Sequence, residues 1–202
     1  REIVNYPGYN NSTGPELTGA IAEHAKSFGV EVVRGEVVDV DFSNDIKVIK
    51  TKKDEFLAKS VIVATGTESR VLGIPGEREL TGQGVAYCAT CDAEFFKGKE
   101  IYVLGAGDQA IEESDYLTGF ASKVTIVVLH EEGHLDCNEV AAEHAYKNPK
   151  IDFVWSSTVQ EIKGSDHVES LVLKNVDTGR ETEVKADGLF LFVGMVPPTE
   201  LV

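Results

Sequence analysis

The segment 99–131, KEIYVLGAGDQAIEESDYLTGFASKVTIVVLHE, is the part of the sequence that most constrains the fold. The apolar run 101–104 predicts a strand, the glycine-rich turn after it leads into a helical pattern, and a second apolar run predicts another strand. A strand, a helix and a strand within about thirty residues form a βαβ unit. Because parallel strands need such a crossover, the sequence predicts an α/β fold with a parallel sheet.

The turn in this unit follows the pattern G-x-G-x-x-G/A, with Gly105, Gly107 and Ala110 at its three small positions. In a dinucleotide-binding fold the first glycine permits the tight turn and the second lets the backbone approach a pyrophosphate. The third position needs a small residue where helix and strand meet. The N-terminus of the following helix offers N–H groups to the phosphates. The pattern favours a nucleotide site, and a tight turn without a ligand is the alternative.

The end of the second predicted strand indicates which nucleotide such a site accepts. An acidic residue there favours the ribose 2′-hydroxyl of NAD, whereas an arginine favours the 2′-phosphate of NADP. The segment 130–136 carries three carboxylates, Glu131, Glu132 and Asp136, and no Lys or Arg. Because carboxylates repel a phosphate, NADPH is not expected to bind. NADH, or a domain that has lost its nicotinamide cofactor, remains open.

Two of the three cysteines lie three residues apart in the segment 84–96, GVAYCATCDAEFF. This pair, Cys88 and Cys91, is a candidate redox dithiol, an inert buried pair, or half of a zinc site. The other zinc ligands would come from the segment 130–137, which holds His130, His134 and Cys137. Because these lie at the far end of the βαβ unit, the redox dithiol is favoured and no metal site is expected.

Asp92 directly follows the cysteine pair. A carboxylic acid at this position can pass a proton to a leaving thiolate, so Asp92 is a candidate acid in thiol–disulfide exchange. The alternative is an aspartate that caps a helix or closes a turn.

Composition excludes several classes of function. The formal net charge is −15, which argues against nucleic acid and against anionic membrane surfaces. No apolar run approaches the length of a membrane-spanning helix, so we expect a soluble, cytoplasmic protein. The chain begins with Arg1 and its single methionine is Met195, so we expect a processed or partial chain.

The rest of the chain gives a coarser pattern. Strands are expected within 30–42 and 45–67, and the last of them includes VIVATG at 61–66, a continuous apolar run typical of a strand buried on both faces. The glycine-rich stretch 68–84 predicts a domain boundary. The segment 151–198 predicts a run of short strands.

Several of these stretches together resemble the low-molecular-weight thioredoxin reductases, flavoproteins of the disulfide reductase class. The resemblance rests on the segments 84–125, 5–17, 61–66 and 188–201 and covers essentially the whole chain. It implies two Rossmann-like, three-layer nucleotide-binding domains, in which an FAD domain is interrupted by an inserted NAD(P)-type domain. The implied boundaries are 1–69 with 197–202 for an incomplete FAD domain, and 70–196 for the inserted domain with the cysteine pair.

The resemblance also implies roles for the cysteine pair. Cys91 resembles the thiol that faces the flavin, Cys88 the thiol that attacks the partner disulfide, and Asp92 the proton donor. Asn5 resembles an asparagine near the isoalloxazine ring, and Thr65 with Gly66 resembles the strand end beside FAD. The partner is expected to be a thioredoxin-like protein, and the family works as homodimers in which one domain rotates against the other.

The sequence departs from the family pattern in three ways. The glycine loop for the FAD pyrophosphate has no counterpart before Arg1, and the Gly-Asp strand end has none after Val202, so we expect a fragment that binds FAD weakly or not at all. The arginine-rich motif for the NADPH phosphate reads instead as the acidic segment 130–136. In this respect the sequence is similar to relatives that take electrons from ferredoxin.

These features predict a thioredoxin-disulfide reductase in which electrons pass through FAD to the Cys88/Cys91 dithiol and on to thioredoxin. The expected electron donor is ferredoxin or NADH. The alternatives are a non-catalytic nucleotide-binding module in which the cysteines act as a redox sensor, and an inactive fragment of the reductase.

Overall fold

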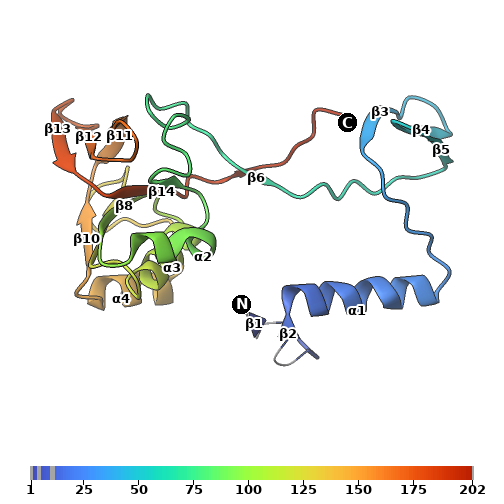
Figure 1. The fold of residues 1–202 in the computed structure, drawn as a ribbon, viewed down its shortest axis with the longest axis horizontal. Coiled ribbons are helices and arrows are strands. Elements are labelled where there is room, and N and C mark those ends of the chain that lie inside the picture. The colour runs from blue at the N-terminus through green and yellow to red at the C-terminus, as the bar shows by residue number, and fades with distance from the viewer. Residues whose placement is uncertain (1, 4–5, 10–11, 202) are drawn as a thin grey trace. The chain divides into compact units, whose positions relative to one another are not determined.

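The computed structural model describes residues 2–3, 6–9 and 12–201, and the chain divides into two compact units (Figure 1). Unit 1 comprises residues 1–64 and 199–202, and unit 2 comprises residues 65–198. Each unit is built around its own strands, and all residues from the predicted dithiol to the predicted nucleotide loop fall in unit 2.

The described residues of unit 1 form one helix and two small antiparallel sheets. Strands β1 (Glu2–Ile3) and β2 (Ser12–Thr13) pair with each other, and β3 (Val37–Asp41), β4 (Lys47–Thr51) and β5 (Glu55–Ala58) form a three-stranded sheet in that order. Helix α1 (Gly14–Ser27) begins at a capping box, in which the Glu16 carboxylate accepts the Thr13 backbone N–H at 2.9 Å. Such a box satisfies helix N–H groups that have no partner within the helix.

Two of the expected strands in unit 1 differ from the structure. Only Val37–Asp41 is a strand within the expected stretch 30–42. The prediction that 61–66 includes a strand buried on both faces is wrong, because this stretch forms no strand and Ile62 is 93 % exposed. A strand of a parallel sheet needs hydrogen-bonded neighbours. No described segment pairs with 61–66, and the apolar run is therefore left in an extended, solvent-facing conformation.

Unit 2 is centred on a five-stranded parallel sheet. Its order is β10 (Ile151–Val154), β9 (Lys123–Val127), β8 (Glu100–Leu104), β14 (Gly188–Leu191) and β7 (Val85–Ala86). Strands β8 and β9 are parallel neighbours, and helix α3 (Asp108–Leu117) lies between them in the chain. The predicted α/β fold and its βαβ unit are therefore confirmed.

The side chains of the parallel sheet alternate between two apolar layers, as the period of two in a strand requires. One apolar cluster includes helix residues, and β8 and β14 contribute Ile101, Val103 and Phe190 to it. A second apolar cluster receives Leu104 and Leu189 from the same strands. The first layer holds the helical elements α2 (Ala89–Asp92), the 3₁₀ helix η1 (Ala93–Phe96), α3 and α4 (Glu139–Lys147).

The second layer is an antiparallel sheet of β11 (Ser157–Lys163), β12 (Ser170–Asn175) and β13 (Glu181–Lys185). Figure 1 shows these strands on the side of the parallel sheet away from α3 and α4. The short strands β6 (Glu68–Ser69) and β15 (Met195–Val196) pair as a two-stranded ribbon within unit 2. The expected run of short strands over 151–198 is thus confirmed.

Among the described residues, no helix combines the length and the apolar character needed to cross a membrane.

Candidate functional site

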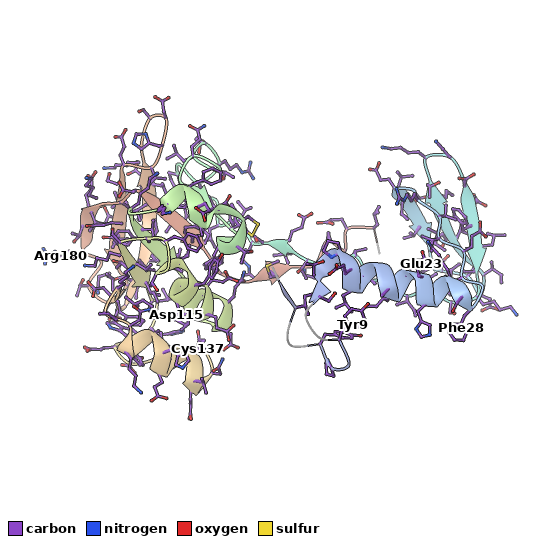
Figure 2. The ribbon with its side chains drawn as sticks, turned by 60° about the horizontal axis from the view of Figure 1, so that its bottom comes forward. Tyr9, Glu23, Phe28, Asp115, Cys137 and Arg180 are labelled. Carbon is purple, nitrogen blue, oxygen red and sulfur yellow. A yellow bond between two sulfur atoms is a disulfide. The ribbon has the colours of Figure 1, made fainter. Side chains whose placement is uncertain are left out.

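Cys88 and Cys91 are joined by a disulfide, with their Cα atoms 5.3 Å apart. Cys88 follows the edge strand β7 and is the N-cap residue of α2, which carries Cys91. Figure 2 draws the disulfide with the other side chains. Buried Ala89 and Ala93 hold α2 and η1 against the core, so that the disulfide stays at the surface. Cys91 is exposed and Cys88 is half-buried.

The hydroxyl of Thr90 contacts the disulfide from within the four-residue loop, because its Oγ1 lies 3.5 Å from Cys88 Sγ. Thr90 was not among the residues predicted from the sequence. The only signal for it is its position between the two cysteines, and position alone does not say which sulfur a side chain approaches.

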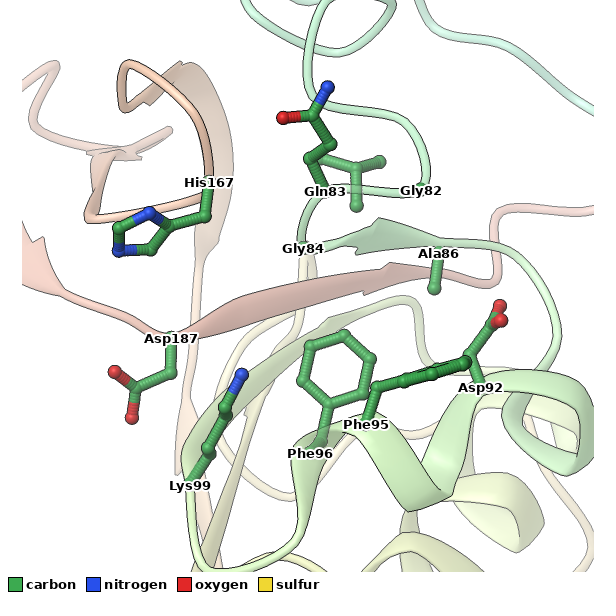
Figure 3. Close-up of a pocket in the computed structure, with 11 residues that line it drawn as sticks. Gly82, Gln83, Gly84, Ala86, Asp92, Phe95, Phe96, Lys99, His167 and Asp187 are labelled. Atoms are coloured by element: carbon green, nitrogen blue, oxygen red, sulfur yellow. The ribbon is translucent and has the colours of Figure 1, made fainter.

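A pocket of about 250 Å³ begins beside the disulfide segment and runs along β7 (Figure 3). Asp92 lies at one end and His167 and Asp187 at the other, with the rings of Phe95 and Phe96 between them. Phe96 is buried and packs edge-on against Phe190, with ring centroids 4.9 Å apart, whereas Phe95 is 71 % exposed. Phe95 therefore presents an exposed aromatic ring in the pocket that Asp92, the residue after Cys91, also lines.

The glycine loop has the backbone that its sequence pattern requires. Gly105 has φ +143°, and a Cβ there would lie 2.3 Å from the carbonyl oxygen of Phe192, so that a side chain does not fit. Gly107 is the N-cap residue of the ten-residue helix α3 and has open space where a Cβ would be. Ala110 is fully buried where α3 meets the sheet. The loop 105–107 thus leaves its backbone uncovered at the N-terminus of α3, and this surface is called the cradle below.

A second pocket, of about 460 Å³, lies at this loop. It is lined by the three loop residues 105–107, by apolar side chains and by His130 and Asp136. The Asp136 backbone N–H donates to the carbonyl oxygen of Ala106 at 2.9 Å, which fixes the acidic segment directly against the loop. The carboxylate of Asp136 lies 2.7 Å from Nε2 of His130, and the ring of His134 stacks on that of His130 at 4.7 Å.

The charge around the cradle is negative. Glu131 and Glu132 are exposed in the same segment, and Asp108 begins helix α3. One oxygen of Asp108 accepts both the backbone N–H and the side-chain amide of Asn138, at 2.7 and 2.9 Å, and thereby ties the loop to the start of α4.

The candidate zinc ligands are not brought together. Cys88 and Cys91 are held in the disulfide, while His130 and His134 contact Asp136. Cys137 is half-buried, and burial raises the pKa of its thiol. Within the described part of the chain, no group of three or more His, Cys, Asp or Glu side chains is placed to hold a metal ion.

The residues expected beside FAD are only partly described. Asn5 lies outside the described residues. Thr65 and Gly66 are exposed and belong to a stretch without helix or strand, and Thr65 Oγ1 donates to the Pro198 carbonyl oxygen at 3.3 Å. Of the residues expected beside FAD, the structure therefore describes only Thr65 and Gly66, which lie in an open, exposed stretch.

A buried carboxylate that the sequence analysis missed lies close to the cysteine pair in the chain. Glu77 is fully buried and accepts hydrogen bonds from the backbone N–H groups of Leu72 and Ile74 and from the hydroxyl of Tyr87, at 3.1, 3.0 and 2.7 Å. Burial, followed by the hydrogen bond to Glu77, raises the pKa of Tyr87 to about 12. Tyr87 directly precedes Cys88, so this network anchors the approach to the disulfide.

Comparison with protein families matches residues 3–202 to the family described as pyridine nucleotide-disulphide oxidoreductase. The chain belongs to this family. Among curated members of this kind, the thioredoxin reductase of Peptoclostridium acidaminophilum is 50 % identical over 99 % of the chain and 65 % of its own length. The chain therefore spans about two thirds of the length of such a relative.

Solved structures of this oxidoreductase family include two useful neighbours. The thioredoxin reductase of Lactococcus lactis in its FR conformation matches with a TM-score of 0.88 and 46 % identity, over 100 % of this chain and 66 % of that chain. A ferredoxin-flavin thioredoxin reductase from Clostridium acetobutylicum matches with a TM-score of 0.50 and 32 % identity, over 100 % of this chain and 64 % of that chain. The resemblance to thioredoxin reductases is confirmed.

Proposed function

We propose that the protein is a thioredoxin-disulfide reductase in which the Cys88/Cys91 dithiol reduces a thioredoxin-like partner. The observation that carries the proposal is the Cys88–Cys91 disulfide at the surface of unit 2, with Cys91 exposed and a pocket beside it. A disulfide held in a short surface loop is accessible to an attacking thiolate. The similarity to named thioredoxin reductases supports the same function.

The chain's own residues account for the exchange with the partner. In the dithiol form, the Cys88 thiolate attacks one sulfur of the partner disulfide, and the partner's other sulfur leaves. Asp92 supplies the proton to the leaving thiolate. Cys91 then attacks Cys88, which re-forms the Cys88–Cys91 disulfide and releases the partner in its dithiol form. When FAD is bound, it supplies the two electrons that regenerate the Cys88/Cys91 dithiol.

The partner is proposed to dock along the pocket beside β7. The exposed ring of Phe95 offers an apolar contact in this pocket, and Asp92, Lys99 and Asp187 line the same pocket with charge of both signs. An aromatic anchor inside a polar rim is a common arrangement at protein interfaces.

The electron donor is proposed to be ferredoxin or NADH. Support comes from the carboxylate of Asp136, whose backbone is hydrogen-bonded to the glycine loop, and from exposed Glu131 and Glu132 beside it. A 2′-phosphate placed against these carboxylates is repelled, whereas the 2′-hydroxyl of NADH can donate to one of them.

The same proposal includes the domain organisation, the oligomeric state and the location. We propose an FAD domain of residues 1–69 and 197–202, an inserted domain of residues 70–196, a homodimer and a cytoplasmic location.

The first experiment separates the two cysteines. The Cys91→Ser and Cys88→Ser variants, each as the full chain, are mixed with a thioredoxin whose second cysteine is replaced and whose first is activated with thionitrobenzoate. Release of thionitrobenzoate measures attack by the remaining thiol. We expect the Cys91→Ser variant, which keeps Cys88, to react about tenfold faster and to accumulate the mixed disulfide. Faster reaction of Cys88→Ser would reverse the roles.

If neither variant forms a mixed disulfide, the reductase proposal fails and the redox-sensor module is favoured.

The donor is tested separately with the full chain, FAD, thioredoxin and one donor at a time. We expect thioredoxin to be reduced with reduced ferredoxin or NADH at a rate at least about tenfold above the rate with NADPH. Equal or faster turnover with NADPH would refute the donor assignment without affecting the roles of the cysteines.

A further inference from the structure

We propose that the hydroxyl of Thr90 is a catalytic group that stabilises the Cys88 thiolate and so makes Cys88, the less exposed of the two cysteines, the attacking thiol. The inference rests on the proposed function, because it assigns a residue to the exchange step of that reaction. It starts from the contact between Thr90 Oγ1 and Cys88 Sγ at 3.5 Å.

The contact is specific to one sulfur. Among the described residues, Thr90 provides the one side-chain hydrogen-bonding contact of Cys88 Sγ, and the sulfur of Cys91 has none. The Thr90 hydroxyl has no other partner in the described part of the chain, so its hydrogen is free to turn towards the sulfur. A hydroxyl can donate one hydrogen bond, and a thiolate is a far better acceptor than a disulfide sulfur.

The charges near the cysteine pair make such a donor useful. Asp92 directly follows the pair, and its proposed role is to give a proton to the partner's leaving thiolate, so it does not stabilise the Cys88 thiolate. No Lys, Arg or His side chain within the described residues forms an ion pair or a hydrogen bond with Cys88. A hydrogen bond to the charged form of a thiol lowers its pKa, and here the neutral hydroxyl supplies that bond.

Exposure alone would select the other cysteine. Cys91 is exposed whereas Cys88 is half-buried, so a partner reaches Cys91 more easily. The thiolate, however, is the reacting species, and an unperturbed cysteine with a pKa of about 8.5 is mostly protonated at neutral pH. A donor on Cys88 but not on Cys91 gives Cys88 the larger thiolate fraction and thereby decides which sulfur attacks.

The exchange step balances with this assignment. A two-electron reductant first opens the disulfide to the Cys88/Cys91 dithiol. Cys88 loses its proton to solvent, and the resulting thiolate is stabilised by Thr90. It forms a bond to one partner sulfur while the partner's sulfur–sulfur bond breaks and the leaving thiolate takes up a proton. Cys91 then loses its proton and attacks Cys88: the Cys88–Cys91 bond forms, the bond between Cys88 and the partner sulfur breaks, and that sulfur takes up a proton, which releases the partner dithiol.

The test measures the pKa of each thiol separately, without FAD, donor or partner. Cys88 is observed in a Cys91→Ser background and Cys91 in a Cys88→Ser background, with the full chain and peptide-resolved mass spectrometry after timed alkylation by iodoacetamide. Alkylation rate against pH gives the pKa. Two substitutions are compared in each background: Thr90→Val, which has nearly the same shape and no hydroxyl, and Thr90→Ser, which keeps the hydroxyl.

We expect Thr90→Val to raise the pKa of Cys88 by roughly 0.5–1 unit and to slow its alkylation at neutral pH by about three- to tenfold. Thr90→Ser should stay within about twofold of the parent, and the pKa of Cys91 should not respond to either substitution. Cys137, far from the pair in the chain, serves as an internal standard for alkylation, and circular dichroism confirms that the variants fold.

Three results would overturn the assignment: an unchanged Cys88 pKa in Thr90→Val, an equal shift in Thr90→Ser, or an equal shift in Cys91. Because this readout needs no turnover, it stands apart from the test of reductase activity. A Cys88 pKa that depends on Thr90 in a protein that forms no mixed disulfide with thioredoxin would support the effect of Thr90 on the thiolate and would refute the proposed function, and with it the catalytic role of Thr90.

Discussion

The buried network of Glu77 and Tyr87 allows a quantitative prediction about unit 2. Glu77 is fully buried and its carboxylate accepts three hydrogen bonds, one of them from the hydroxyl of Tyr87 at 2.7 Å. A hydrogen bond to a charged group contributes about 1.5–3 kcal/mol. Because Tyr87 is only half-buried, water replaces part of the lost bond, and we expect Tyr87→Phe to lower the free energy of unfolding by about 1–2 kcal/mol.

Replacement of Glu77 by Ala leaves three donors without their acceptor and also leaves a void. The loss is partly offset because the variant no longer buries a carboxylate, which by itself is unfavourable by several kcal/mol. We therefore expect Glu77→Ala to lower the free energy of unfolding by about 2–4 kcal/mol. In the double variant, the missing hydroxyl of residue 87 adds little, because its acceptor is already gone. The two losses are thus expected to be strongly non-additive.

Urea unfolding followed by tryptophan fluorescence tests this reasoning. Trp155 is the only tryptophan in the sequence and lies in unit 2, so its signal reports on that unit alone. Tyr146→Phe is the matched control, since that hydroxyl makes no hydrogen bond to another described residue, and it should change stability by less than about 0.5 kcal/mol. Additive losses from Tyr87→Phe and Glu77→Ala, or a Tyr87→Phe loss no larger than the control, would refute the network as a stabilising unit.

Three further predictions concern unit 2. Tyr87 has a pKa of about 12 in the folded protein and near 10.0 in the unfolded chain, so the free energy of unfolding of unit 2 should fall as pH rises through this window. Tyr87→Phe should remove that part of the fall, as measured by urea titrations at several pH values. Gly105→Ala should lower the free energy of unfolding by about 2–4 kcal/mol, because its Cβ would lie 2.3 Å from a backbone oxygen, whereas Gly107→Ala should change it by less than about 1 kcal/mol; urea midpoints compare the two. Phe96→Ala should cost about 3–5 kcal/mol by the same measurement, and Phe95→Ala less than about 1 kcal/mol, since only the first ring is buried.

The sequence predicted the elements whose signals are local. The βαβ unit, the glycine loop at Gly105 and the short strands of 151–198 all depend on periodicity and turn residues within a few positions, and each is present. The stretch 61–66 failed because a buried parallel strand depends on neighbours that are remote in sequence. Its apolar composition favours a buried position between strands, and no described strand pairs with it.

The site shows the same division between local and remote information. The spacing of Cys88 and Cys91 was sufficient to predict a pair that can close, and the structure contains the disulfide. Glu77 was not found, because a carboxylate in a glycine-rich turn looks like an ordinary surface residue until its three donors are brought around it. A sequence pattern does not show which remote residues pack around a side chain, so a polar side chain whose role depends on burial cannot be predicted from the pattern.

The acidic segment illustrates why the donor needs geometry as well as charge. Counting carboxylates treats Glu131, Glu132 and Asp136 alike, but the structure separates them. Asp136 is hydrogen-bonded through its backbone to the glycine loop and through its carboxylate to His130, so that it is held at the cradle in a fixed position. Glu131 and Glu132, which precede Asp136 in the segment, are exposed. A nucleotide bound at the loop would therefore meet two kinds of carboxylate: the held carboxylate of Asp136, which would repel the phosphates, and the exposed carboxylates of Glu131 and Glu132, which could accept a hydrogen bond from a ribose hydroxyl. NADH would bind only if that hydrogen bond outweighed the repulsion, whereas an electron-carrying protein that docks elsewhere on the surface would avoid the repulsion.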